Sequence, residues 1–243
     1  MRLFLTGWTS LLLFLALPVH GASLLGPTPY LSFADSPFDG LSFDTWYLED
    51  FEDGLFNVPG VTGTNNSGNG SLFVFPGGCV TCDSVDGDDG AIDGFGRGGA
   101  SLANQTNLPT DHLGYTFSFD SNVLGGLPTH VGIVWTDGSV SAATQFEAFG
   151  PANGSLGVVG PTHIADNNFN GGTAEDRFFG AINLAGISSF TIRSPGGANN
   201  MTVDHLQYGI LSPSSASPVP EPSSLLLLGT GLLGMAGWAY RRR

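Results

Sequence analysis

The chain has 243 residues, a formal net charge of −14 and no lysine. Between its two ends the only cations are Arg97, Arg177 and Arg193, against 20 of the 21 acidic residues. Nucleic acids and anionic lipids are bound through lysine and arginine, so we expect no nucleic-acid partner. Divalent cations and neutral glycans suit such a surface better, although a high charge also serves solubility alone.

The first residues have the pattern of a signal peptide. Arg2 gives a positive start, residues 11–17 are apolar, and Pro18 is followed by small Gly21. An ordinary buried helix is the alternative, but a cleavage pattern and turn-rich sequence follow directly. We therefore assign residues 1–22 to a signal peptide, which implies export by the Sec machinery and removal by a signal peptidase.

Residues 23–211 have the composition of an all-β domain. Glycine and proline interrupt the chain about every 8 to 12 residues, and the runs between them carry β-branched and aromatic side chains. Asn153-Gly154 and Asp137-Gly138 are typical hairpin turns. We predict a two-sheet antiparallel sandwich, jelly-roll-like, in one domain. The expected strands span residues 71–75, 114–119, 130–135, 144–149, 178–182, 189–193 and 201–208.

Cys79 and Cys82 form a CxxC pair in a chain that reaches an oxidising compartment, so a local disulfide is expected. Redox catalysis would need a helix N-terminus, and acidic residues follow instead. Haem attachment would need histidine at position 83, which is aspartate, and a four-cysteine zinc site lacks two ligands.

An acidic, glycine-rich loop follows the cysteines. Clustered carboxylates in such a loop can wrap around calcium. The loop departs from an EF-hand because Gly90 and Arg97 occupy ligand positions, so a solvated loop is an equal alternative. The candidate calcium ligands are Asp83, Asp86, Asp88, Asp89 and Asp93.

Catalytic motifs are not found. The histidines of the body lie far apart, and there is no HExxH, GxSxG or phosphate loop. His205 follows Asp204 on an expected strand, so the two side chains should point to opposite faces. We expect no enzyme, although paired carboxylates of a glycosidase remain an alternative.

The C-terminal end combines four features: a Ser/Pro linker at residues 212–219, the tripeptide Pro220, Glu221 and Pro222, an apolar stretch at 223–240, and three final arginines. As a helix the apolar stretch would measure about 27 Å, which is just enough for a hydrocarbon core. The arginines Arg241, Arg242 and Arg243 should keep that end in the cytoplasm. A plain single-span membrane anchor is the alternative.

Residues 220–243 resemble the PEP-CTERM sorting domain, which is also called an ice-binding protein C-terminal domain. That second name gives no evidence of ice binding. The resemblance implies a helix at 223–240 that holds the protein in the inner membrane until an exosortase processes it. The protein would then reach the cell surface or the extracellular space, alongside exopolysaccharide and biofilm.

Parts of the body resemble the first and last strands of lectin-like jelly rolls: Trp46 to Gly54 near the start, and Phe178 to Ile182 with Met201 to Gly209 near the end. The resemblance implies a structural calcium ion held by Asp50 or Glu52 together with Asp204. An exposed strand face is the alternative for Asp204.

Three functions follow from these features. The first is a surface or matrix component processed by exosortase. The second is a carbohydrate-binding module that stacks sugars on exposed aromatic residues such as Trp46, Trp135 or Tyr115. The third is a glycoside hydrolase. Two or more aromatic side chains exposed along one concave face would favour the second function.

Overall fold

The computed structural model describes residues 21–66, 72–77, 83–105, 113–138, 143–166, 168, 170–195, 200–213 and 240–241. Residues 1–20, the cysteines at 79 and 82, the tripeptide at 220–222, and Arg242 and Arg243 lie outside this part. Among the described residues no helix is long and apolar enough to span a membrane.

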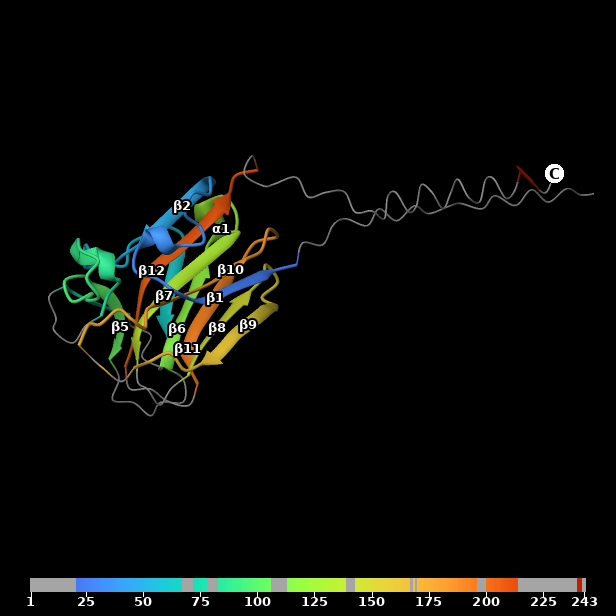
Figure 1. Cartoon of the computed structure of the whole chain (residues 1–243). Helices are drawn as coiled ribbons and strands as arrows, with labels where there is room; N and C mark the ends of the chain where they lie inside the picture. The colour runs from blue at the N-terminus through green and yellow to red at the C-terminus, as the bar shows by residue number, and fades with distance from the viewer. Residues whose placement is uncertain are drawn as a thin grey trace, which may run out of the picture.

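The body is a sandwich of two antiparallel sheets (Figure 1). The larger sheet runs in the order β1 (Ser23–Pro29), β10 (Arg177–Ile182), β7 (His130–Gly138), β12 (Asn200–Leu211), β5 (Ser101–Gln105) and β4 (Phe73–Phe75), with β2 (Phe43–Glu49) also on β12. The smaller sheet runs β3 (Val61–Asn65), β6 (Leu113–Phe119), β11 (Ser189–Ser194), β8 (Thr144–Phe149) and β9 (Ser155–Thr162). Short helices lie at η1 (Phe33–Asp35), η2 (Asp86–Asp89) and α1 (Ser121–Leu124). The predicted all-β sandwich is confirmed.

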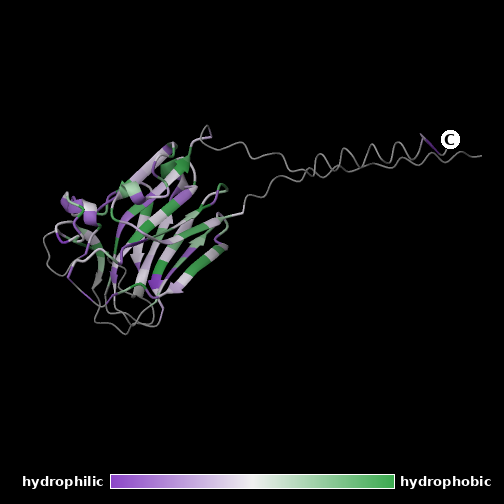
Figure 2. Cartoon of the chain, in the orientation of Figure 1, coloured by the Kyte–Doolittle hydropathy of each residue, from purple (hydrophilic) through white to green (hydrophobic). Residues whose placement is uncertain are grey.

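The core between the sheets is built from side chains that alternate along the strands. On β6, Tyr115 and Phe117 are fully buried, whereas the residues that follow each of them, Thr116 and Ser118, face outward. Phe190 on β11 lies 5.1 Å from Phe117, ring centre to ring centre, within an aromatic layer. Figure 2 shows this alternation of hydrophobic and hydrophilic positions along the strands.

The larger sheet is covered on its outer face as well. A second apolar cluster there contains Tyr30, Phe38 and Val134, with Phe43 and Trp46 packed at its edge. Every residue of β7 is consequently buried. Polar groups on this outer face are removed from water, and each needs a partner.

All seven predicted strands coincide with observed strands. Among the described strands, β1, β3, β5 and β9 were not predicted, and β2 was indicated only by the resemblance of the stretch that starts at Trp46. Glycine and proline interrupt the β-branched pattern in several of them, as at Gly157, Gly160 and Pro161 in β9. These residues bend an outer strand without ending it.

One predicted hairpin is confirmed and the other is wrong. Asn153 adopts a φ of 57° in the turn between β8 and β9. Asp137 and Gly138 instead form the last two residues of β7, where they pair with Thr202 and Met201 of β12. Pairing with the long strand β12 overrides the turn preference of this dipeptide.

Candidate functional site: a carboxylate cluster at a bulge in strand β12

Strand β12 changes its neighbour halfway along its length. Its residues 200–203 pair with β5, and its residues 206–211 pair with β2 on the same side. The end of β2 and the start of β5 therefore meet beside Asp204 and His205, the two residues between these ladders. On the other side, the register with β7 shifts between Asp204 and Gln207, which marks a β-bulge.

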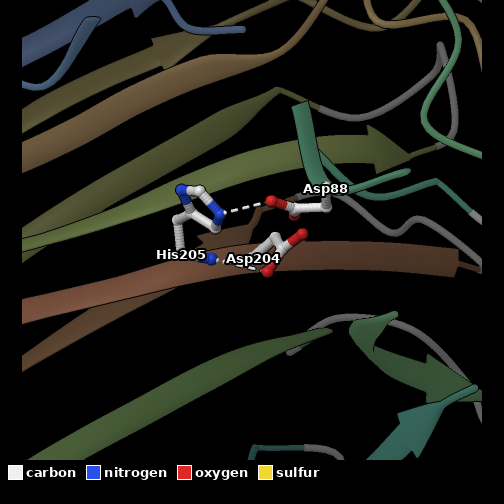
Figure 3. Close-up of side chains that lie close together, drawn as sticks. All are labelled: Asp88, Asp204 and His205. Carbon is white, nitrogen blue, oxygen red and sulfur yellow. Dashed lines mark hydrogen bonds and ion pairs between the residues drawn. The ribbon is translucent and has the colours of Figure 1, made fainter. Parts of the chain in front are cut away.

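The bulge brings Asp204 and His205 to one site. His205 has a φ of 44°, in the left-handed region that histidine enters more readily than most residues. Ligand atoms of Asp88, Asp204 and His205 all lie within 4.8 Å of one another (Figure 3). The prediction that Asp204 and His205 face opposite ways is wrong, because the bulge breaks the two-residue period of the strand.

Asp204 is fully buried. One carboxylate oxygen accepts a hydrogen bond from the Val85 amide at 3.0 Å, and the other accepts from the His205 amide at 2.7 Å. Burial, and then the neighbouring carboxylate of Asp88, raises the pKa of Asp204 well above its usual range. Asp88 Oδ2 is buried and has no hydrogen-bond partner among the described residues. The two carboxyl groups therefore need a proton or a cation between them.

His205 lies in a chain of hydrogen bonds through the outer layer. Its Nε2 is 2.9 Å from Asp88 Oδ1, and its Nδ1 is 2.8 Å from the Tyr30 hydroxyl. Gln207 Nε2 donates to that hydroxyl at 2.9 Å, and Ser36 donates to Gln207 Oε1 at 2.6 Å. One placement of the protons gives each of these hydrogen bonds a donor and an acceptor. In it, the Tyr30 hydroxyl donates to His205 Nδ1, and His205 Nε2–H donates to Asp88 Oδ1.

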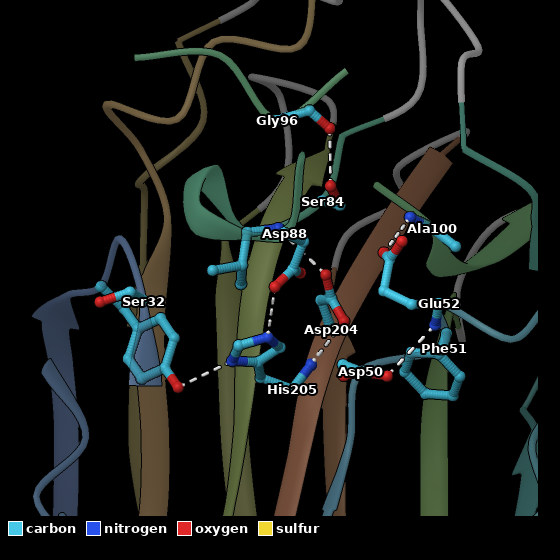
Figure 4. Close-up of polar contacts among 12 residues, drawn as sticks. Ser32, Asp50, Phe51, Glu52, Ser84, Asp88, Gly96, Ala100, Asp204 and His205 are labelled. Carbon is cyan, nitrogen blue, oxygen red and sulfur yellow. Dashed lines mark hydrogen bonds and ion pairs between the residues drawn. The ribbon is translucent and has the colours of Figure 1, made fainter. Parts of the chain in front are cut away.

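Glu52 reaches the same region from the segment after β2 (Figure 4). Its Oε1 accepts a hydrogen bond from the Ala100 amide, just before β5. A Cβ atom at Gly99 would lie 2.9 Å from both Glu52 Oε1 and Asp88 Cβ. Gly99 therefore leaves room for these two side chains to approach. Asp50 accepts from the Glu52 amide at 3.2 Å, which orders the turn.

The carboxylates of the acidic loop have different partners. Asp88 faces the cluster, whereas the Asp86 carboxylate accepts hydrogen bonds from the backbone amides of residues 93–95. Asp89 and Asp93 are exposed, and each accepts from an amide two residues later. Asp83 is buried, and neither of its carboxylate oxygens has a hydrogen-bond partner among the described residues.

The sequence identified Asp88, Asp204 and Glu52 as candidates but missed His205 and Tyr30. One signal was present: Met201, Val203, Leu206 and Tyr208 all face the core. Their spacing changes from two to three residues at Asp204 and His205, and a strand with such a change contains a bulge.

The hydrogen bonds of the Tyr30 hydroxyl with His205 and Gln207 predict a measurable energetic coupling between Tyr30 and Gln207. Tyr30→Phe should lower the free energy of unfolding by about 1–3 kcal/mol, because His205 Nδ1 and the Gln207 amide lose their partner. With Gln207→Met, urea unfolding should give a double-mutant coupling of at least about 0.5 kcal/mol. Tyr115→Phe, which loses bonds to the Met201 and Leu102 carbonyls but none to His205 or Gln207, is the control. Additive losses for Tyr30 and Gln207 would contradict the chain of hydrogen bonds.

Comparison with known proteins identifies one motif. Residues 218–243 match the PEP-CTERM protein-sorting motif, which confirms the resemblance seen in the tail. The motif implies an exosortase as the processing partner. None of the curated proteins matches the chain significantly.

Several solved structures are similar to the body. The K2 cleaved adhesin domain of Lys-gingipain has a TM-score of 0.45 and 11% identity, covering 68% of this chain and 100% of the domain. The K1 domain from Porphyromonas gingivalis W83 has a TM-score of 0.39 and 13% identity, with 69% and 99% covered. A family 22 carbohydrate-binding module of Clostridium thermocellum Xyn10B has a TM-score of 0.35 and 11% identity, with 74% and 99% covered. These similarities are too distant to indicate what the chain binds.

The sorting motif follows a body that ends with β12 at Leu211. The chain therefore combines a β-sandwich body with a PEP-CTERM protein-sorting motif at residues 218–243, and this motif indicates an exported protein.

Proposed function

We propose that this protein is a component of the cell surface or extracellular matrix whose sandwich is freed from the inner membrane when an exosortase processes its tail. The observation that carries the proposal is the sorting motif at residues 218–243. It follows the last strand after a short Ser/Pro linker. A surface or matrix role, in contact with exopolysaccharide or biofilm, needs no catalytic centre.

The order of the tail suits this processing. A helix at 223–240 would hold the chain in the inner membrane, and the final arginines would keep its end in the cytoplasm. The tripeptide at 220–222 would then lie at the outer surface of that membrane. The linker of residues 212–219, extended at about 3.3 Å per residue, would separate the folded body from the peptidase.

Replacing Pro220, Glu221 and Pro222 together with alanine should abolish processing. Full-length protein should accumulate in the inner membrane, because the sandwich and the apolar stretch are unchanged while the recognition motif is gone. Immunoblots of membrane, surface and medium fractions measure this, with Ser215→Ala in the linker as the control. Unchanged processing of the triple variant would contradict the sorting assignment.

We further propose that Glu52, Asp88 and Asp204 hold a structural calcium ion. Carboxylate oxygens are the ligands that calcium prefers, and Asp88 Oδ2 is buried without a partner beside Asp204 in the described structure. His205 orients Asp88 through its Nε2 and leaves the ion an all-oxygen site. Such an ion would join β2, β12 and the start of β5 where their ladders meet.

Thermal unfolding tests this calcium site. Calcium at about 100 times its Kd should stabilise the chain by about 2.7 kcal/mol, which raises the Tm by about 5 °C or more relative to EDTA. Asp204→Asn should remove the part of this increase that an ion at this site supplies, and Asp89→Asn, on the exposed side of the loop, should keep it. Equal responses from the two variants would contradict the assignment.

A second candidate function is glycan binding, and the exposed face of the smaller sheet favours it. Tyr115 and Trp135 are buried in the core and Trp46 is half-buried, so two of the three predicted stacking residues are unavailable. Instead, hydroxyl side chains form two cross-strand rows on β3, β6 and β11, a surface that can hydrogen-bond to neutral sugars. The rows are Thr64, Thr116 and Thr191, and Thr62, Ser118 and Ser189.

Native gels that contain xylan, galactan or β-glucan test this candidate. If one of them slows the protein, Thr64→Val with Thr191→Val should restore its mobility while leaving the Tm nearly unchanged, because both positions lie outside the core. Thr45→Val in β2 of the other sheet is the control. Unchanged retardation of the double variant would exclude this face.

A further inference from the structure

A second group of buried carboxylates comes mostly from other segments than the first cluster, although the Asp204 charge still acts on one of its members, Asp176. Glu175 and Asp176 come just before β10, Asp137 lies at the end of the adjacent strand β7, and Asp83 starts the acidic loop. Their exposed fractions are 1% for Asp83, 6% for Asp137, 3% for Glu175 and 0% for Asp176. We call these four residues the β7/β10 carboxylate group.

Three of the four carboxylates lack hydrogen-bond donors from other residues, whereas Asp137 accepts from the Gly138 amide. Within the described residues, neither oxygen of Asp83 or of Asp176 has a hydrogen-bond partner. Both oxygens of Glu175 are likewise buried and have no hydrogen-bond partner in another residue. Only the backbone amide of Glu175 itself lowers its pKa by hydrogen bonding. A buried carboxylate without hydrogen bonds is costly, and several together are costlier still. This differs from Asp86, whose carboxylate is surrounded by backbone amides.

The nearest arginine does not neutralise the group. Arg177 donates from Nη1 to the backbone carbonyls of Ala174 at 3.0 Å and Asp176 at 2.7 Å. Its charge lowers the pKa of Glu175 less than any other influence on that group. Arg177 therefore stabilises the turn through these two carbonyls. Its guanidinium hydrogen bonds go to the backbone and not to the carboxylates of the group.

The four carboxylates affect one another. Burial, and then Asp137 and Glu175, raises the pKa of Asp83 to about 9. Burial, and then Asp83, raises the pKa of Asp176 well above its usual range. Asp137 and Glu175 each have a pKa of about 7, raised mainly by burial. A contact places the loop at this end of β7: Thr136, next to Asp137, donates from its hydroxyl to the Asp83 carbonyl at 3.2 Å.

A neutral oxygen donor lies in the same turn. The Thr173 hydroxyl is buried and unpartnered in the described structure, and the Asp176 amide donates to the Thr173 carbonyl at 3.2 Å. One turn before β10 therefore supplies a hydroxyl and two carboxylates. All of these donors are oxygen atoms, a set that suits a hard divalent cation and not zinc or copper.

We propose that Asp83, Glu175 and Asp176, with Asp137 and the Thr173 hydroxyl beside them, bind a second calcium ion that fastens the acidic loop to the β7/β10 ladder. The loop is already attached at this place. The Gly96 amide donates to the Gly171 carbonyl at 2.9 Å, and the Thr173 amide donates to the Gly94 carbonyl at 3.2 Å.

The spacing of these donors differs from that of the first cluster. Among the described residues, only Asp88, Asp204 and His205 bring three ligand atoms within 4.8 Å of one another. The carboxylates of the β7/β10 group do not bring three ligand atoms to that distance, although all four are buried. Calcium tolerates flexible geometry with six to eight oxygen ligands, so it can draw these side chains together where magnesium would fit less well.

Isothermal titration of the full chain with calcium, after EDTA treatment and dialysis, counts the sites. Asp83→Asn with Asp176→Asn should bind one calcium fewer per chain than the unchanged protein. In EDTA this double variant should melt at least as high as the unchanged protein, because Asn cannot carry the buried charge whose cost raises the pKa of Asp83 and Asp176. Asp88→Asn should lose the other site and keep this one.

Two results would overturn the second site. One is equal calcium stoichiometry in the unchanged protein and the double variant. The other is a lower Tm of the double variant in EDTA combined with an unchanged calcium response, which would show a purely structural role. Glu175→Gln provides an independent variant, and it too should lose one calcium. Because Asp88→Asn is measured in parallel, failure of this site is distinguished from failure of the first.

Discussion

The fold depends on how the negative charge under its outer layer is neutralised. Asp83, Asp176 and Asp204 are each no more than 1% exposed, and two like charges about 4 Å apart repel by about 4 kcal/mol at an effective dielectric constant of about 20. A domain is stable by only about 5–15 kcal/mol. Charges of this kind must therefore be compensated for the outer layer to stay in place.

The arginines of the described body are committed elsewhere. Arg177 binds backbone carbonyls. Arg193 lies on the smaller sheet beside Gln145 and Glu147, and the Arg97 guanidinium lies 4.7 Å from the ring centre of Phe95. With no lysine in the chain, compensation must come from protons or from bound cations. The two proposed calcium ions would account for both carboxylate groups with one mechanism, and they would link the outer layer to β7, β10 and β12.

The sequence predicted the sandwich because buried strands alternate strongly, as at Tyr115 and Phe117. It predicted the sorting tail because that motif is short, linear and independent of the fold. It failed where tertiary contacts decide the outcome. Asp137-Gly138 has turn chemistry but pairs with β12, and Asp204 and His205 share a face only because of the bulge. Glu175 and Asp176 showed no motif, since burial alone sets them apart from other acidic residues.

A high-resolution crystal structure of the mature protein grown in calcium tests the central claim most directly. The account predicts one cation among Glu52, Asp88 and Asp204 and a second among Asp83, Glu175 and Asp176, each with oxygen ligands at about 2.3–2.6 Å. Short hydrogen bonds of about 2.5–2.7 Å between carboxyl groups, with no ion at either place, would show that protons compensate the buried charge and would contradict the account.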